Sequence, residues 1–274
     1  MTTTLRPTEP LQHNDDGTRS RRYQVCVNGR PIGALQLGTH PVFGDAVARI
    51  GQLRIEEPDR RRGRGTVAAL AAEEVARGWG CRRIEVTVTG DTGPALRLAT
   101  ALGYVVRNRG MEKPLGTTPP ALPRGSAARP MTEAEYGPWL AASHEGYIRS
   151  WVERGVPQAE ARAKSERDHA ELLPEGPRTP DVFLSVLEHE GTPVGTLWVG
   201  TRDGCAFVYD VETDAAHRGE GHGRTLMLVA EAYAIEAGHR TIGLNVFAGN
   251  TPAERLYESL GYETTLRAMY KTLL

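Results

Sequence analysis

The chain of 274 residues is long enough for two domains of ordinary size, each able to bury its own core. Its hydrophobic residues (39%) and charged residues (24%) occur at fractions usual for globular proteins, and its apolar runs fall far short of a membrane-spanning helix. The N-terminus lacks a charged start followed by an apolar segment, so we expect a cytoplasmic protein without a secretory signal or a membrane partner.

A formal net charge of −1 hides an asymmetry between the two halves of the chain. Residues 1–126 carry a net charge of +7, whereas residues 127–274 carry −8. The acidic half either docks on the basic half or attracts a cationic molecule. The three cysteines are isolated and the eight histidines show no clustered ligand spacing, so we predict neither a disulfide framework nor a metal site.

The first half of the chain predicts strands that alternate with helices behind a polar lead. Residues 1–20 are interpreted as a turn or disordered segment. The pair Asn28-Gly29 between two apolar runs is a strong hairpin signal. We predict strands at 23–27, 31–37, 46–55, 83–89 and 104–113, and helices at 66–77 and 94–102.

The second half begins after a segment rich in proline and glycine, residues 116–130, which we interpret as an interdomain linker. Thr132 followed three residues later by Glu135 is a capping box, so a helix is expected from there to residue 154. We predict further helices at 158–173, 225–237 and 252–260, and strands at 182–188, 193–199, 206–213, 241–247 and 262–272.

The stretch 217–224 lies between a predicted strand and a predicted helix and is typical of an anion site. The first turn of a helix offers unpaired backbone N–H groups and the positive end of the helix dipole. Arg218 adds a charged donor, and glycines allow a close approach of the backbone at Gly219, Gly221 and Gly223. The same arrangement occurs at residues 60–65.

An internal repeat relates these two turns. Shifting the sequence by 158 positions matches eighteen identical residues without a gap, from Arg60 with Arg218 to Tyr104 with Tyr262. So many identities at one offset indicate two copies of one domain and not a solenoid.

The repeated motif resembles the signature of the Gcn5-related N-acetyltransferases, Arg/Gln-x-x-Gly-x-Gly/Ala. It stands as Arg60, Gly63 and Gly65 in the first copy and as Arg218, Gly221 and Gly223 in the second. At the family's spacing the second copy continues with the strand 244–247, Asn250 and the segment 253–262. The resemblance implies an α/β (α+β) class with two tandem folds of this family, each a mixed, mostly antiparallel sheet flanked by helices. Residues 1–115 are expected to form a shortened domain, residues 116–130 a linker, and residues 131–274 a complete domain.

The resemblance also implies acetyl-CoA as a cosubstrate and no metal. The central strand, 207–213, is expected to splay from 241–247, and the pantetheine arm fills that gap. An N–H near Val211 would stabilise the oxyanion. The implied CoA-binding residues are Val211, Thr213, Arg218, Gly219, Glu220, Gly221, His222, Gly223, Arg224, Asn250, Ala253 and Tyr257. A second candidate CoA site comprises Arg60, Gly63, Arg64 and Gly65.

Acetyl transfer to an amine requires that the protonated amine first lose a proton. Asp210 and Glu212, on one face of the strand, are candidates for the base, with substrate docking or plain hydrogen bonding as the alternative. Tyr257, at the family's tyrosine position, is the candidate acid for the leaving thiolate, and a packing role is its alternative. Asn250 is expected to bond the pantetheine or to orient that tyrosine. Asn245 stands where other members carry a glutamate, so we assign no base there.

The two copies differ at these positions. Under the same offset, Tyr257 and Asn250 correspond to Ala99 and Thr92, and Asp210 and Glu212 correspond to the pair Gln52 and Arg54. The first copy also lacks counterparts of the two helices between 132 and 173. We therefore expect it to be a non-catalytic scaffold.

Two other readings stay open. The arginines at 60–64 and 82–83 suggest a nucleic-acid-binding module, although aromatic stacking residues do not accompany them. The second alternative is that the chain is a CoA-binding sensor without turnover. The retained Tyr257 and Asn250 argue against this alternative. The acceptor is expected to be a small cationic molecule or a protein amine, on a monomeric pseudo-dimer or a homodimer.

Overall fold

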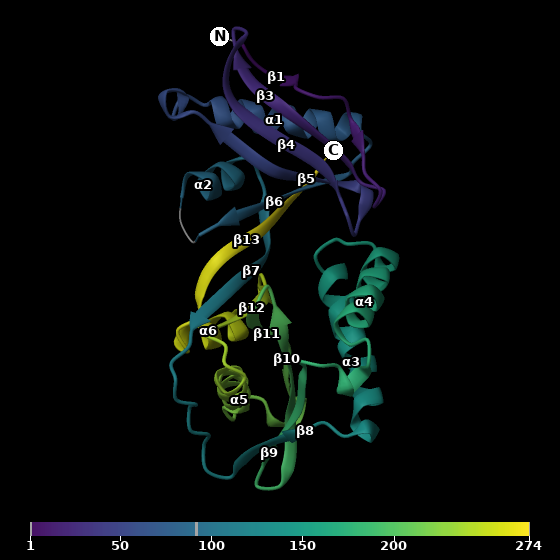
Figure 1. Ribbon diagram of the computed structural model, residues 1–274, viewed down its shortest axis with the longest axis vertical. Coiled ribbons are helices and arrows are strands. Elements are labelled where there is room, and N and C mark those ends of the chain that lie inside the picture. Colours follow the sequence, from purple (N-terminus) through teal and green to yellow (C-terminus); the bar gives the residue numbers. More distant parts are fainter. Residues whose placement is uncertain (1, 91–92, 274) are drawn as a thin grey trace. The chain divides into compact units, whose positions relative to one another are not determined.

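The computed structural model describes residues 2–90 and 93–273, which form two compact units. One unit comprises residues up to Arg109 together with the segment from Thr265 onward. The other comprises Gly110–Thr264. Figure 1 labels the helices and strands of each unit.

The first unit is a sheet in the order β1-β3-β4-β5-β6-β13, with β2 paired to β3. Neighbouring strands are antiparallel except β5 and β6, which are parallel. The predicted hairpin is confirmed, and Asn28 and Gly29 both have positive φ, at 47° and 83°. The strands are β1 (Thr3–Pro7), β2 (Gln12–His13), β3 (Arg19–Val27), β4 (Arg30–His40), β5 (Gly44–Ile55), β6 (Arg83–Thr89) and β13 (Glu263–Thr272). The helices are η1 (Glu57–Asp59), α1 (Arg64–Gly78) and α2 (Pro94–Ala101).

The expectation of a turn or disordered lead at residues 1–20 is confirmed for the turn at residues 14–17 but wrong for Thr3–Pro7 and Gln12–His13, which form strands. β1 pairs with β3 from Thr3 opposite Val27 to Pro7 opposite Tyr23, and Leu5 packs against the core. Backbone pairing with a buried strand orders this polar segment, which has little apolar surface of its own.

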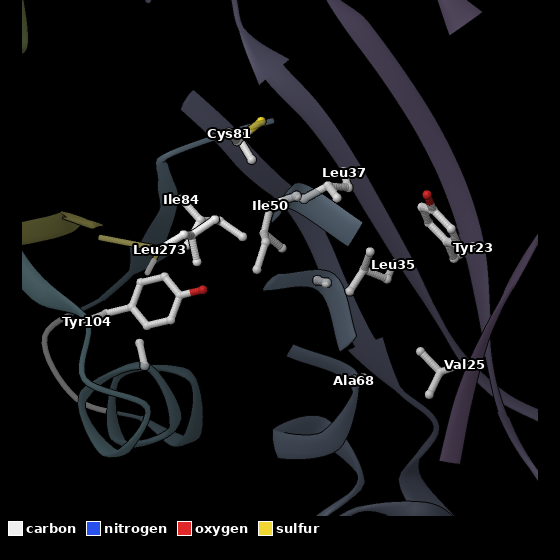
Figure 2. Close-up of a cluster of buried hydrophobic side chains, with 14 of the residues drawn as sticks. Tyr23, Val25, Leu35, Leu37, Ile50, Ala68, Cys81, Ile84, Tyr104 and Leu273 are labelled. Atoms are coloured by element: carbon white, nitrogen blue, oxygen red, sulfur yellow. The ribbon is translucent and has the colours of Figure 1, made fainter. Parts of the chain in front are cut away.

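The core of the first unit lies between α1 and the sheet. α1 presents a stripe of small residues, Ala68, Ala72 and Ala76, which allows the helix to pack closely on the strands. Figure 2 shows Leu273 from the end of the chain among these buried side chains, near Tyr104 and Ile84.

The second unit is a sheet in the order β7-β12-β11-β10-β9-β8, in which β11 and β12 are parallel. Its strands are β7 (Val105–Pro114, from Gly110 onward), β8 (Ser126–Pro130), β9 (Phe183–His189), β10 (Thr192–Arg202), β11 (Cys205–Thr213) and β12 (Thr241–Phe247). Its helices are α3 (Glu133–Val152), α4 (Gln158–Leu172), η2 (Gly176–Arg178), η3 (Ala215–His217), α5 (His222–Glu236) and α6 (Thr251–Ser259).

Helices cover both faces of this second sheet (Figure 1). α5 packs on one face with buried residues such as Leu226 and Met227 against Leu197 of β10. α3 packs on the other face, where Trp139 meets Trp198 edge-on with ring centroids 5.7 Å apart. The predicted capping box of Thr132 and Glu135 is present at the start of α3. Among the described residues, the helices are too short or too polar to cross a bilayer.

The interpretation of residues 116–130 as a linker is wrong at its end. Ser126–Pro130 forms β8, which pairs antiparallel with β9 from Ser126 opposite His189 to Pro130 opposite Ser185. The Arg129 side chain bonds Glu188 of β9 and Glu135 of α3, which fixes this edge strand. Composition rich in Pro and Gly did not reveal the strand because an edge strand tolerates proline.

The last strands of the two sequence copies are exchanged between the units. β7 ends the first copy but joins the sheet of the second unit, and β13 ends the second copy but joins the sheet of the first unit. In the first unit, Lys271 of β13 bonds the buried Glu73 of α1 at 2.7 Å. In the second unit, Lys113 of β7 bonds the buried Glu231 of α5 at 2.8 Å. These pairs are related by the 158-residue offset, so the exchange is reciprocal.

The same exchange is visible in the cores. Met269 lies in the core of the first unit, and its repeat equivalent Met111 lies in the core of the second. The compact units therefore do not follow the linear boundaries 1–115 and 131–274. Those boundaries describe the sequence repeat, and each folded unit completes its sheet with a strand from the other copy.

Candidate active site

The glycine turn of the second copy joins η3 to α5. Gly219 and Gly221 have φ of 85° and 92°, a left-handed conformation that favours glycine. Arg218 donates from Nε to the Thr213 carbonyl at 3.3 Å, which anchors the turn to the end of β11. The turn thus directs the N-terminus of a fifteen-residue helix toward the end of the central strand, as an anion site requires.

β11 separates from β12 beside this turn. The parallel ladder runs only from Ala206 opposite Ile242 to Val208 opposite Leu244. The pairing with β10 shifts at the same place, where Val199 faces Val208 and Trp198 faces Asp210, so that Tyr209 is an extra residue. The bulge and the end of the ladder bear out the expected splay of the central strand.

Asp210 follows the bulge directly and lies half-buried beside Trp139 of α3. Burial, and secondarily the charge of Glu212, raise the pKa of Asp210 to about 6. The Val211 backbone N–H and the nearby Trp139 indole oppose this shift by favouring the charged carboxylate. Within the described residues the Trp139 indole N–H has no hydrogen-bond partner of normal geometry. A carboxyl group with this pKa is ionised at neutral pH and basic enough to accept a proton.

Glu212 lies two residues further along β11 in a different environment. Its side chain is exposed and lies 3.6 Å from the guanidinium of Arg218. The two predicted carboxylates therefore differ, because Asp210 is half-buried with a raised pKa whereas Glu212 faces solvent beside a cation.

Tyr257 lies on α6 and is 7% exposed. Burial, and secondarily the charge of Asp210, raise the pKa of Tyr257 to about 12. The phenol is therefore protonated across the physiological range. Asn250 is the N-cap of α6, where its side-chain oxygen accepts from the Ala253 N–H at 3.4 Å.

The remaining predicted CoA-binding residues surround the turn. Gly223 packs beside Leu256 and Thr213, and Arg224 donates to the Ser259 hydroxyl of α6. His222 is buried, and its Nε2 lies 3.2 Å from a Glu220 carboxylate oxygen.

A cavity of about 240 Å³ opens on the α3 side of the sheet, where Glu212 lines it and Asp210 does not. Its lining includes three carboxylate residues, Glu135, Glu212 and Asp214, and the indole of Trp139. Sequence reasoning missed Trp139 and Asp214 because neither belongs to a local motif. α3 brings the indole to the site from more than fifty residues away along the chain.

The corresponding turn of the first copy is arranged differently. Arg64, a member of the second candidate CoA site, is buried and forms an ion pair with Asp59. Arg60 donates from Nε to the Ile55 carbonyl at 2.8 Å. Ala99 occupies the tyrosine position and is buried, whereas Thr92, at the Asn250 position, lies outside the described residues.

The basic cluster that suggested nucleic-acid binding is partly internal. Arg64 is 8% exposed, and Arg83 is 9% exposed and pairs with Glu85. Two of its six arginines are thus unavailable to a phosphate backbone, which weakens that hypothesis.

Comparison with known proteins gives a consistent result. A family model described as the Acetyltransferase (GNAT) family matches the chain twice, over residues 2–104 and 140–262. The uncharacterized N-acetyltransferase YycN of Bacillus subtilis (strain 168) is 31% identical over 151 residues, which make up 53% of this chain and 96% of that protein. A mycothiol acetyltransferase of Thermomonospora curvata is 29% identical over 254 residues, 89% of this chain and 79% of that protein.

Solved structures share the fold. A Gcn5-related N-acetyltransferase from Sphaerobacter thermophilus aligns with a TM-score of 0.61 and 19% identity, covering 92% of this chain and 80% of that one. A tandem GNAT protein from the clavulanic acid biosynthesis pathway aligns with a TM-score of 0.51 and 23% identity, covering 94% of this chain and 84% of that one. The tandem arrangement is therefore found in an experimental structure.

Proposed function

The chain belongs to the acetyltransferase (GNAT) family and is an acyltransferase, and on that premise we propose that its second copy transfers the acetyl group of acetyl-CoA to a primary amine. The observation that carries the proposal is the pair of proton-transfer groups in one site. Asp210 has a pKa of about 6 and Tyr257 has one of about 12, so at neutral pH the first is a base and the second an acid.

Acetyl-CoA supplies a thioester carbonyl activated toward attack. Gly219 and Gly221, with Arg218, are proposed to bind its pyrophosphate at the N-terminus of α5. The open edge of β11 beyond Val208 is proposed to pair with the pantetheine arm near Val211 and Thr213. Asn250 caps the helix that carries Tyr257, which supports its orienting role over direct contact with the pantetheine.

The chain's residues then move protons in two steps. Asp210 accepts a proton from the ammonium group of the acceptor, directly or through a water molecule, which frees the nitrogen lone pair for attack on the carbonyl carbon. A backbone N–H near Val211 is proposed to stabilise the oxyanion. When the carbon–sulfur bond breaks, Tyr257 donates its phenolic proton to the CoA thiolate. The attacking nitrogen then loses its second proton, which restores the phenol, and Asp210 releases the first proton to solvent.

The acceptor is proposed to be a small cationic amine bound in the cavity that Trp139, Glu212 and Asp214 line. The carboxylates of Glu212 and Asp214 complement a positive charge, and the face of Trp139 favours a cation. Glu212 is assigned to acceptor binding and not to proton transfer, because it is exposed and lies beside Arg218.

The first copy is proposed to be a scaffold. Gln52 and Arg54 replace the carboxylates, and Ala99 replaces the acid, so it retains neither a proton acceptor nor a donor at these positions. A cytoplasmic location and a monomeric pseudo-dimer stay predictions.

The release of the CoA thiol, measured against a panel of polyamines, amino sugars, amino acids and peptide N-termini, tests the proposal. We expect turnover with cationic amines, and we expect Asp214→Asn to raise KM for the cationic acceptor while KM for acetyl-CoA stays unchanged. Tight binding of acetyl-CoA without thiol release against the whole panel would contradict the proposal and favour a sensor.

A further inference from the structure

Two histidines and a carboxylate meet at the glycine turn in a way that proton transfer does not use. His217 ends η3, Glu220 lies in the turn, and His222 begins α5. One ligand atom from each lies within 4.8 Å of the others. Histidine spacing had predicted no cluster, because these residues are separated by three and two positions in a loop and not by the intervals of a helix or a familiar metal motif.

The distances suit a tetrahedral ion. His217 Nδ1 lies 3.5 Å and His222 Nε2 lies 3.2 Å from the same carboxylate oxygen of Glu220. A zinc ion bound at about 2.1 Å to each ligand atom holds those atoms about 3.4 Å apart. Imidazole nitrogens with a carboxylate are a donor set that zinc-like transition metals prefer, whereas magnesium prefers oxygen ligands alone.

The surroundings leave room for the rest of a coordination shell. A cavity of about 270 Å³ is lined by Glu220 and His222 and also by His189 and Ser126. The His189 ring lies 5.1 Å from the His222 ring, and its Nδ1 lies 3.1 Å from the Ser126 hydroxyl. The cavity gives water access to the two ligands, so an ion can enter and keep a water molecule as its fourth ligand.

The first copy carries an ion pair at the positions of the two histidines. Under the 158-residue offset, His217 and His222 correspond to Asp59 and Arg64, which form a buried ion pair. The guanidinium group there joins η1 to the start of α1. In the second copy this link is replaced by two imidazoles and the carboxylate of Glu220, which a divalent cation would join in the same way.

From this geometry we propose that His217, Glu220 and His222 bind a divalent transition-metal ion of the zinc class. The ion ties η3 to the first turn of α5 and so orders the turn. The site is independent of the amine acceptor and of the proton-transfer residues.

The test uses untagged full-length protein carrying Cys205→Ser, because Cys205 is an exposed free thiol that itself attracts soft metals. Zinc is titrated against a chromogenic chelator near pH 7.5. We expect one equivalent to bind, with at least tenfold weaker binding in His217→Ala and in Glu220→Gln. Both variants change exposed or half-exposed side chains, so they are expected to fold.

A matched variant separates metal binding from the stability of the turn. His217→Asp combined with His222→Arg installs the ion pair of the first copy, so we expect it to fold and not to bind zinc. His239→Ala removes a histidine outside the site and is expected to bind zinc like the parent. Absence of zinc binding by the parent at micromolar concentration overturns the proposal and leaves only hydrogen bonds from the histidines to Glu220. Undiminished binding by both single variants also overturns it.

Discussion

Asp210 is half-buried, whereas its repeat equivalent Gln52 is exposed. The pKa of Asp210, about 6, lies above the ordinary value of 3.8 because its carboxyl group is desolvated beside α3. The same shift that makes it a useful base also makes it unfavourable for folding at neutral pH, because burial disfavours its charged form.

Asp210→Asn is expected to change activity and stability in opposite directions. Removing the base should lower kcat/KM by about 100-fold or more and abolish its rise with an apparent pKa near 6. Because the folded-state pKa exceeds the unfolded value, the charged carboxylate reduces the free energy of unfolding as pH rises from about 4 to 6. The variant should therefore be more stable at pH 7.5, by up to about 3 kcal/mol, and not at pH 4.

Urea denaturation of the wild type and Asp210→Asn at pH 7.5 and pH 4 measures the difference in their free energies of unfolding. A pH–rate profile measures whether the rise of kcat/KM with an apparent pKa near 6 is lost. Glu212→Gln is the matched control and should keep this rise of kcat/KM with pH, because Glu212 is exposed beside Arg218. If the rise of kcat/KM disappears in Glu212→Gln and persists in Asp210→Asn, Glu212 is the base and Asp210 is not.

Tyr257→Phe should lower kcat by tenfold or more while leaving the Kd of acetyl-CoA unchanged, because the phenol is needed only when the thiolate leaves. Tyr262→Phe is a suitable control, since the ring of Tyr262 lies 6.0 Å from that of Tyr257 and is also buried. Stopped-flow or steady-state thiol release, with calorimetry for binding, separates the two quantities. Equal turnover of Tyr257→Phe and the wild type would assign Tyr257 to packing.

At the scale of single elements, most strands and helices were predictable because their local signals agree with the fold. The strands β6 and β12 have the predicted bounds, and the capping box of α3 is present. β1 and β8 were missed because both are edge strands, ordered by pairing and not by apolar alternation. The bulge at Tyr209, which places Asp210 toward α3, depends on the register with β10 and has no local signature.

The start of α6 distinguishes two roles for Asn250. Asn250→Ala should cost about 1 kcal/mol and lower turnover, because the cap of the helix that carries Tyr257 is lost. Asn250→Asp keeps an oxygen that accepts from the Ala253 N–H, so it should retain both stability and turnover. If turnover falls equally in both variants while Asn250→Asp keeps its stability, the Asn250 amide N–H groups bind the pantetheine and do not act only through the helix cap.

At the scale of the whole molecule, the repeat was visible in the sequence, whereas the exchange of last strands was not. Both copies carry a methionine and a lysine at matching positions of the last strand, Met111 with Met269 and Lys113 with Lys271. Identical residues fit either unit equally well, so the sequence contains no signal for which unit each strand joins. The exchange is revealed only by tertiary contacts, such as the pairing of β13 with β6 and the ion pair between Lys113 of β7 and Glu231 of α5.

The exchange predicts that distant ends of the chain stabilise the opposite copy. Lys271→Met should destabilise the first unit by about 3 kcal/mol, because the buried Glu73 loses the nearer of its two cations and keeps only Arg77 at 3.9 Å. Lys113→Met should have a similar effect on the second unit through Glu231. Hydrogen exchange resolved by segment reports which unit opens. Loosening of α5 in Lys271→Met, with α1 unaffected, would contradict the exchange.

The central claim is that acetyl transfer occurs in the second copy and that the first is a scaffold. Gly221 and Gly63 are equivalent positions of the two turns, both with positive φ and with open space around an added Cβ. Replacing each with tryptophan therefore introduces the same strain and the same obstruction of the pyrophosphate position. With saturating amine, we expect CoA-thiol release to be abolished in Gly221→Trp and retained in Gly63→Trp. Retained turnover in Gly221→Trp, or its loss in a folded Gly63→Trp, would contradict the claim.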